Sequence, residues 1–191
     1  MTLAYLIDRA KAHSLTYNVI TPKGSGTKIP PFNNITENPA VVFLLNFTTA
    51  QRSALLSASS TLALLYTPAN EHFGIGPVEA MVCGVPVLAC DSGGPTESII
   101  DADGERTGWL RKPDAEVWAE TLLQMINLSP EERAALGQRA RKRAQDNFSM
   151  KAMAKGIEDA LEKAVTMGPV SLTPVVAVLT ILFLLLARLL L

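Results

Sequence analysis

The segment that decides the fold is residues 61–89, which read TLALLYTPANEHFGIGPVEAMVCGVPVLA. Two short apolar runs, 61–66 and 85–89, enclose a polar loop and a stretch with helical spacing near 77–83. Apolar runs of this length, without polar alternation, are typical of parallel strands that are buried on both faces. The segment therefore predicts a strand–helix–strand unit, which is the building block of α/β folds.

Stretches of the same character continue on both sides of this unit. Upstream, the sequence predicts a strand over 41–45 and a helix over 49–57, with Leu55 and Leu56 on the inner face of that helix. Downstream, it predicts a short strand over 108–110 and then three helices, which cover 114–127, 130–147 and 150–166. Short strands that alternate with helices indicate βαβ units around a parallel sheet.

The chain divides into three parts by this reading. Residues 1–39 hold a partial helix and strand and a loop rich in Pro and Gly. Residues 40–166 carry the alternating pattern and form a single Rossmann-like domain of the α/β class. Residues 169–191 form a hydrophobic C-terminal helix.

Composition limits the possible functions. Of the 191 residues, 48% are apolar and 18% are charged, which excludes a disordered chain. The net charge of -1 gives no electrostatic reason to expect a nucleic-acid partner. Two cysteines, Cys83 and Cys90, lie in an apolar context without further ligands at metal spacing, so we expect two free thiols and no metal ion.

The C-terminal tail is much more apolar than the rest of the chain. Residues 175–191 contain 15 apolar residues of 17, and Arg188 is the last charged side chain. A helix of this length rises roughly 26 Å, which is close to the roughly 27 Å core of a thin bilayer. We therefore predict a membrane anchor, with a buried core helix as the alternative.

Basic residues are concentrated in the two helices before the tail. The start of the first of these helices is marked by Ser129-Pro-Glu-Glu132, a capping box with Pro at the first helical position. A solvated helix surface accounts for the basic residues, and contact with an anionic membrane is the alternative. They are Arg139, Arg141, Lys142, Arg143, Lys151 and Lys155.

The loop after the 61–66 strand carries the candidate chemistry. Glu71 lies in this loop and Glu79 lies about one turn into the next helix, so the two carboxylates flank the crevice where open α/β sheets bind ligands. Between them, Phe73, Gly74, Ile75 and Gly76 offer backbone amides at a helix N-terminus, an arrangement that suits a phosphate or diphosphate. Carboxylates accept hydrogen bonds from vicinal diols. The loop therefore predicts a nucleotide-sugar site.

A second loop follows the 85–89 strand and reads Asp91-Ser-Gly-Gly-Pro-Thr-Glu97. Gly93 and Gly94 form a tight turn whose amides can face an anion. Glu97 can brace that turn. We therefore count these three residues among the donor-binding positions.

These motifs resemble those of the retaining glycosyltransferases of family 4, which have the GT-B fold. The resemblance rests on Glu71 and Glu79 with Phe-Gly between them, on Gly-Val-Pro-Val at 84–87 and on Ser-Gly-Gly-Pro-Thr-Glu at 92–97. It covers residues 40–166 well and residues 1–39 loosely. Within the family, LLYTPANEHFGI most resembles the α-1,3/1,6-mannosyltransferases of dolichol-linked oligosaccharide assembly.

The resemblance implies a function and a role for each site residue. The chain would be the C-terminal, donor-binding half of a GT-B enzyme that transfers mannose from GDP-mannose to a dolichol-diphosphate-linked oligosaccharide in N-glycan precursor assembly. Glu71 would contact the transferred mannose, Glu79 would hold the ribose hydroxyls, and the Phe73–Gly76 backbone would face the sugar and diphosphate. No resident metal or other cofactor is implied. The enzyme would act at the endoplasmic reticulum membrane and face the cytosol.

The chain departs from this family in one respect. A GT-B enzyme reacts between two Rossmann-like domains, and only one is predicted here, so the N-terminal acceptor domain and its basic residues are missing. We expect the chain to be inactive alone. The alternatives are a non-catalytic, membrane-anchored module that binds a nucleotide sugar or a partner, and a family 4 transferase with another nucleotide-diphosphate sugar.

Overall fold

The computed structural model describes residues 2–21, 37–168 and 173–189. Two parallel sheets form the framework, where the sequence had predicted one. The main sheet has the order β3–β4–β5, from Leu64–Tyr66, Val87–Cys90 and Trp109–Arg111. A separate pair joins β1, Tyr17–Ile20, to β2, Val41–Leu44.

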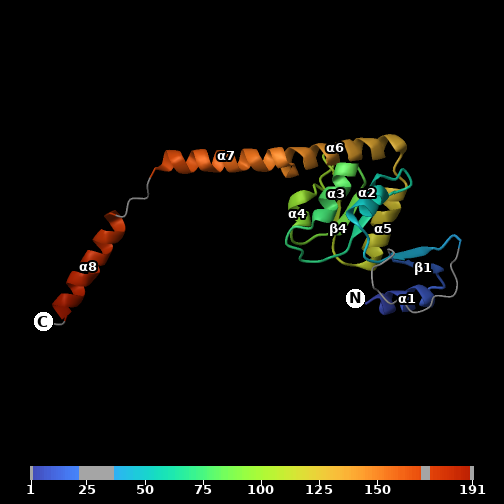
Figure 1. Cartoon of the computed structure of the whole chain (residues 1–191), viewed down its shortest axis with the longest axis horizontal. Helices are drawn as coiled ribbons and strands as arrows, with labels where there is room; N and C mark the ends of the chain where they lie inside the picture. Colours follow the sequence, from blue (N-terminus) through green and yellow to red (C-terminus); the bar gives the residue numbers. More distant parts are fainter. Residues whose placement is uncertain (1, 22–36, 169–172, 190–191) are drawn as a thin grey trace.

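Eight helices lie in the described part of the chain (Figure 1), and all but the short helix Pro95–Ser98 lie close to the predicted positions. Local signals fix several of their ends: Thr48 and Ser129 each form a capping box, and Ser149 caps the helix that follows it. The helices are α1 Leu3–Ala12, α2 Thr49–Ser57, α3 Ile75–Cys83, α4 Pro95–Ser98, α5 Ala115–Ile126, α6 Pro130–Phe148, α7 Met150–Met167 and α8 Thr173–Leu189.

The core is organised around the fully buried strand β4. Val87 and Ala89 pack into a cluster with residues of α3 and α6, whereas Leu88 packs with Met125 of α5 and Leu136 of α6. This alternation follows from the period of two in a strand, which sends successive side chains to opposite faces. The apolar 85–89 run is thus explained by burial on both sides, as the sequence predicted.

The inner face of α2 differs from the prediction. Leu56 packs against the core cluster, but Leu55 is 54% exposed. No residue of α2 is buried. The helix covers the core through one edge only, so adjacent leucines do not share the same environment.

Three of the basic residues on α6 bind backbone carbonyls, which the interpretation as a solvated surface did not include: Arg141 is exposed, and Arg139 and Arg143 are half-buried. Arg141 donates to the carbonyl oxygen of Cys83 at the end of α3, and Arg143 donates to the carbonyls of Glu97 and Ser98 at the end of α4. Arg139 donates to the carbonyl of Arg106. The last carbonyls of a helix have no partner within the helix, so the guanidinium groups of Arg141 and Arg143 satisfy them at the ends of α3 and α4, whereas Arg139 binds the turn before β5.

Close backbone approach also fixes α6 against α3. A Cβ atom on Gly137 would lie 2.8 Å from the carbonyl oxygen of Gly84, which has a φ of +72° at the end of α3. Only glycine allows this distance at position 137. The packing therefore explains a helix-weakening residue inside α6.

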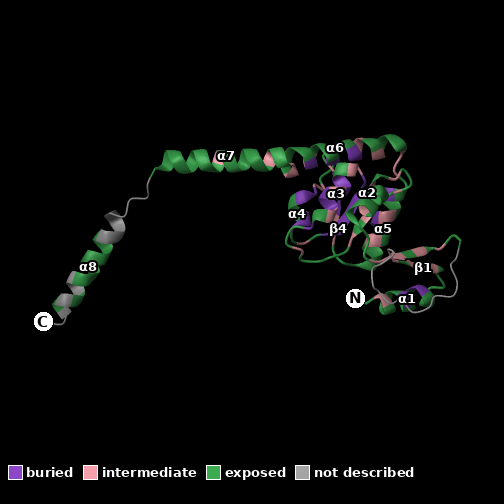
Figure 2. Cartoon of the chain, viewed as in Figure 1, coloured by how far each residue is buried: buried purple, intermediate pink, exposed green. Residues whose placement is uncertain are grey.

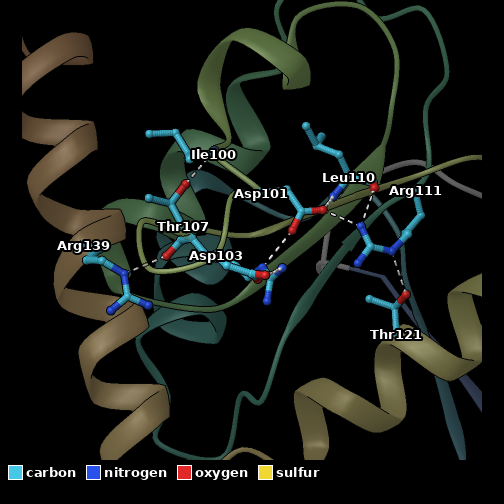
Figure 3. Close-up of polar contacts among 9 residues, drawn as sticks. Ile100, Asp101, Asp103, Thr107, Leu110, Arg111, Thr121 and Arg139 are labelled. Atoms are coloured by element: carbon cyan, nitrogen blue, oxygen red, sulfur yellow. Dashed lines mark hydrogen bonds and ion pairs between the residues drawn. The ribbon is translucent and has the colours of Figure 1, made fainter.

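The turn before β5 is fixed by a polar cluster around Asp101 (Figure 3). Asp101 accepts hydrogen bonds from the Arg106 and Arg111 guanidinium groups and from the backbone N–H of Leu110, at 3.1 Å. Arg111 also donates to Thr121 of α5. The cluster thus joins the turn, the last strand and α5.

Helix α7 extends from the end of α6 without burying any residue (Figure 2). The apolar tail forms α8, which ends at Leu189, and positions 190 and 191 lie outside the described residues. Within the described ranges, no helix is both long enough and apolar enough to cross a membrane. The predicted spanning anchor is therefore not confirmed by the structure.

Candidate functional site

The loops after β3 and β4 interlock at the carboxyl end of the main sheet. The backbone N–H of Gly94 donates to the carbonyl oxygen of Glu71 at 2.7 Å, and that of Asn70 donates to the Ser92 hydroxyl at 3.0 Å. A Cβ atom on Gly94 would overlap the backbone of Phe73. The two loops therefore form one unit, and glycine is required where they touch.

This contact changes the interpretation of the Gly-Gly turn. The amide of Gly94 was predicted to face an anion, but it is bonded to Glu71 instead. Glu97 is exposed, and no bond of its side chain is seen in the described part of the chain. The turn acts here as a support for the Glu71 loop. A role of Gly93, Gly94 and Glu97 in donor binding stays a prediction.

The start of α3 presents free amides. Gly74 caps this helix with a φ of +75° and no side-chain hydrogen bond. Within the described residues, the N–H groups of Gly74, Ile75 and Gly76 have no acceptor, as expected for a first helical turn. The helix dipole adds partial positive charge at this point. The arrangement suits an anionic group such as a diphosphate.

Tyr66, the last residue of β3, supports this turn and was not predicted as a site residue. A Cβ atom on Gly74 would lie 3.1 Å from the Tyr66 ring, and one on Gly76 would lie 3.0 Å from it. The Tyr66 hydroxyl donates to Oε2 of Glu71 at 3.5 Å, a long hydrogen bond. Burial, followed by the nearby Glu71 carboxylate, raises the pKa of Tyr66. The tyrosine thus packs beneath the loop and points its hydroxyl at Glu71.

Glu79 has a different partner from Glu71. Nη2 of Arg52, on α2, lies 2.5 Å from Oε1 of Glu79. Oε2 of Glu79 is withdrawn from solvent and has no hydrogen-bond donor among the described residues. One signal for Arg52 was visible in the sequence: it is the sole charged residue in α2.

The remaining predicted residues lie at the rim of the loop. The Phe73 ring contacts Phe148 of α6 edge to face, with 5.7 Å between ring centroids. Ile75 is exposed, whereas Gly74 is buried and Gly76 is half-buried. Phe73 therefore ties the loop to α6.

The cysteines are free thiols, as predicted. Cys90 is buried and donates to the Thr67 carbonyl at 3.3 Å, and burial raises its pKa. No three side chains of His, Cys, Asp or Glu in the described ranges group as metal ligands. The absence of a resident cofactor stays a prediction.

Two curated relatives are similar to this chain in sequence. The α-1,3/1,6-mannosyltransferase alg2 of Schizosaccharomyces pombe is 40% identical over 145 residues, which are 75% of this chain and 27% of that protein. Human α-1,3/1,6-mannosyltransferase ALG2 is 43% identical over 112 residues, 59% of this chain and 26% of that protein. The chain thus spans about a quarter of the length of these relatives.

Solved structures share the fold. A sucrose-phosphate synthase from Thermosynechococcus elongatus matches 66% of this chain and 31% of its own, with a TM-score of 0.53 and 25% identity. HepE from Anabaena, in complex with UDP-glucose, matches 64% of this chain and 32% of its own, with a TM-score of 0.50 and 26% identity.

The family assignment agrees with this geometry. The sequence profile described as "Glycosyl transferases group 1" matches residues 35–143, which include both interlocked loops, Tyr66 and the Arg52–Glu79 pair. The match takes in more than half of the chain. The chain therefore belongs to the group 1 glycosyl transferases.

Proposed function

We propose that the chain is the donor-binding part of a retaining mannosyltransferase, which takes mannose from GDP-mannose and extends a dolichol-diphosphate-linked oligosaccharide in α-1,3 or α-1,6 linkage. The observation that supports this most directly is the juxtaposition of Glu71 with the free amides that begin α3. The names of the relatives support the choice of mannose and of the lipid-linked acceptor.

The geometry suggests how each group would act. The Gly74–Gly76 amides would hold the diphosphate of the donor, since a helix N-terminus stabilises negative charge that grows as the sugar departs. Glu71 would lie against the mannose, where its carboxylate stabilises positive charge on the reacting sugar. Its orientation would come from Tyr66 and from the Gly94 amide.

The nucleoside would lie towards Glu79. Its carboxylate would accept a hydrogen bond from a ribose hydroxyl. In the retaining reaction implied by the family resemblance, the leaving diphosphate helps to remove the proton of the acceptor hydroxyl, so no resident metal ion is required. We place the enzyme at the cytosolic face of the endoplasmic reticulum, where it would meet both substrates.

The acceptor site would belong to the portion of the relatives that this chain does not span. Catalysis needs the acceptor to be positioned against the donor, and loss of that positioning alone removes a large share of the rate. We therefore expect donor binding but no measurable transfer from this chain by itself.

The test is calorimetry of GDP and GDP-mannose with the full chain. Glu79→Ala should weaken both ligands by about 1–3 kcal/mol, the usual result of unpairing a buried polar group. Glu71→Gln should weaken GDP-mannose more than GDP, because Glu71 is placed at the sugar. Glu120→Ala, at an exposed position on α5, is the matched control and should change neither. Failure of the chain to bind either ligand would overturn the proposal. Tighter binding of UDP than of GDP would overturn the assignment of GDP-mannose as the donor.

A further inference from the structure

The ion pair between Arg52 and Glu79 links two helices at the nucleoside end of the candidate site. Nη2 of Arg52 lies 2.5 Å from Oε1 of Glu79, and the two side chains are 36% and 26% exposed. Arg52 comes from the middle of α2 and Glu79 from the second turn of α3. The carboxylate is therefore held from outside its own helix.

The second oxygen of the same carboxylate is unsatisfied. Oε2 of Glu79 is withdrawn from solvent and receives no hydrogen bond from any described residue. An acceptor that stays buried and unpaired destabilises the folded protein. Native proteins rarely leave such a group unpaired without a ligand or water at the site. One oxygen is thus fixed by a cation and the other is in need of a donor.

We propose that Arg52 is a positioning residue for the nucleotide: its guanidinium holds the Glu79 carboxylate through Oε1, and Oε2, which is covered in this structure, accepts a hydrogen bond from a ribose hydroxyl when the nucleotide displaces the atoms that cover it. This inference rests on the proposed function, which places the ribose at Glu79. A free glutamate loses rotamer entropy when it binds a ligand, and the ion pair removes part of that loss in advance.

The chemistry favours arginine at this position. Its guanidinium keeps its charge at all physiological pH values and presents several N–H donors in a rigid plane. A bond from this group to one carboxylate oxygen leaves the second oxygen free for a hydroxyl. Lysine retains the charge but not the planar geometry, so it should replace arginine only in part.

The experiment compares GDP with 2′,3′-dideoxy-GDP, which lacks both ribose hydroxyls, by calorimetry on the full chain. The wild type should bind GDP more tightly, and this ratio of affinities measures recognition of the diol. Arg52→Gln should lower the ratio by about tenfold, the equivalent of one charge-assisted hydrogen bond, and leave dideoxy-GDP binding unchanged. Arg52→Lys should lower the ratio by a smaller factor. Arg9→Gln, an exposed arginine on α1, should not change it.

A double-mutant cycle separates positioning from independent contact. In a Glu79→Gln background, Arg52→Gln should have no further effect on the ratio, because Arg52 acts through Glu79. Melting temperatures report any loss of folding. If Arg52→Gln does not fold, the ratio of GDP to dideoxy-GDP affinity in Arg52→Lys tests the inference instead. A wild-type ratio in every Arg52 variant, or tighter GDP binding after its removal, overturns this inference alone. No GDP binding by the wild type overturns the proposed function with it.

Discussion

Helices α6 and α7 are consecutive, and both carry apolar residues along one face, yet their environments differ. In α6, the residues Leu136, Gly137, Ala140 and Ala144 are buried. In α7 no residue is buried, and Leu161 and Val165 are 61% and 80% exposed. An amphipathic pattern therefore predicts a helix and its apolar face, but it does not predict the surface that covers that face.

The largest expected difference concerns one leucine in each helix. Leu136 is 3% exposed and lies in the core cluster with Leu88, Trp109 and Met125. Leu136→Ala should lower the free energy of unfolding by about 2–5 kcal/mol, because it leaves a cavity. Leu161→Ala should change it by less than about 0.5 kcal/mol. Urea denaturation measures both. A large loss for Leu161→Ala would show that the α7 face is covered in solution.

The next comparison concerns the basic residues. Arg143 donates to two carbonyls at the end of α4, whereas Lys151 is exposed on α7. Arg143→Gln should lower the free energy of unfolding by about 1–3 kcal/mol, since it leaves these acceptors without partners. Lys151→Gln should have no measurable effect. Equal melting temperatures for the two variants would contradict the role of Arg143 as a link between helices.

Replacement of a glycine by alanine should change stability by a smaller amount, and with opposite signs in α6 and α7. A Cβ atom on Gly137 would crowd the Gly84 carbonyl, but one on Gly156 of α7 meets no atom within 4 Å. Gly137→Ala should destabilise the protein. The steric overlap costs about 1–3 kcal/mol, which outweighs the gain in helix propensity. Gly156→Ala should stabilise α7 by up to about 1 kcal/mol. Circular dichroism during thermal unfolding tests both signs.

The smallest effect is a pH dependence confined to the start of α6. Hydrogen bonds from the Ser129 backbone and hydroxyl lower the pKa of Glu132 below its ordinary value of 4.5. A lowered pKa in the folded state means that the contribution to stability is present above pH 4.5 and is lost as the pH falls through the folded value. Glu132→Gln keeps the cap but cannot titrate, so wild type and variant should converge in melting temperature in acid. The cap of α7 has Ala152 at the corresponding position and should show no such change.

Most elements of the fold could be predicted because their signals are local. The bounds of α2 agree with the expected 49–57, and α6 begins after Ser129, since capping side chains act within one turn. Strand β4 was recognisable from its uninterrupted apolar run. Which strands pair with one another was not recognisable, because strand pairing depends on contacts between residues far apart in the sequence. This is why two parallel sheets replace the expected one.

The site was predicted only in outline for the same reason. Glu71 and Glu79 were selected from their spacing, and the structure gives them separate partners, Tyr66 and Arg52. Neither partner has a motif of its own. Arg52 lies 27 positions before Glu79 and meets it only when α2 packs on α3. The periodic pattern of a helix contains no information about a tertiary contact of this kind.

The hydrogen bond from Gly94 to the Glu71 carbonyl has a consequence for how mutational data on this chain are read. In a saturation screen for donor binding, every substitution at Gly94 should score as severely as one at Glu71, because a side chain there displaces the loop that carries the carboxylate. Such a score would show that the Glu71 loop depends on Gly94 for its position, and not that Gly94 contacts the ligand. Gly94 has a φ of −56°, so its sensitivity comes from the close contact alone. Gly104 shows the opposite case, because its φ is +82° and its Cβ would meet nothing within 4 Å, so a substitution there reports backbone strain without a contact.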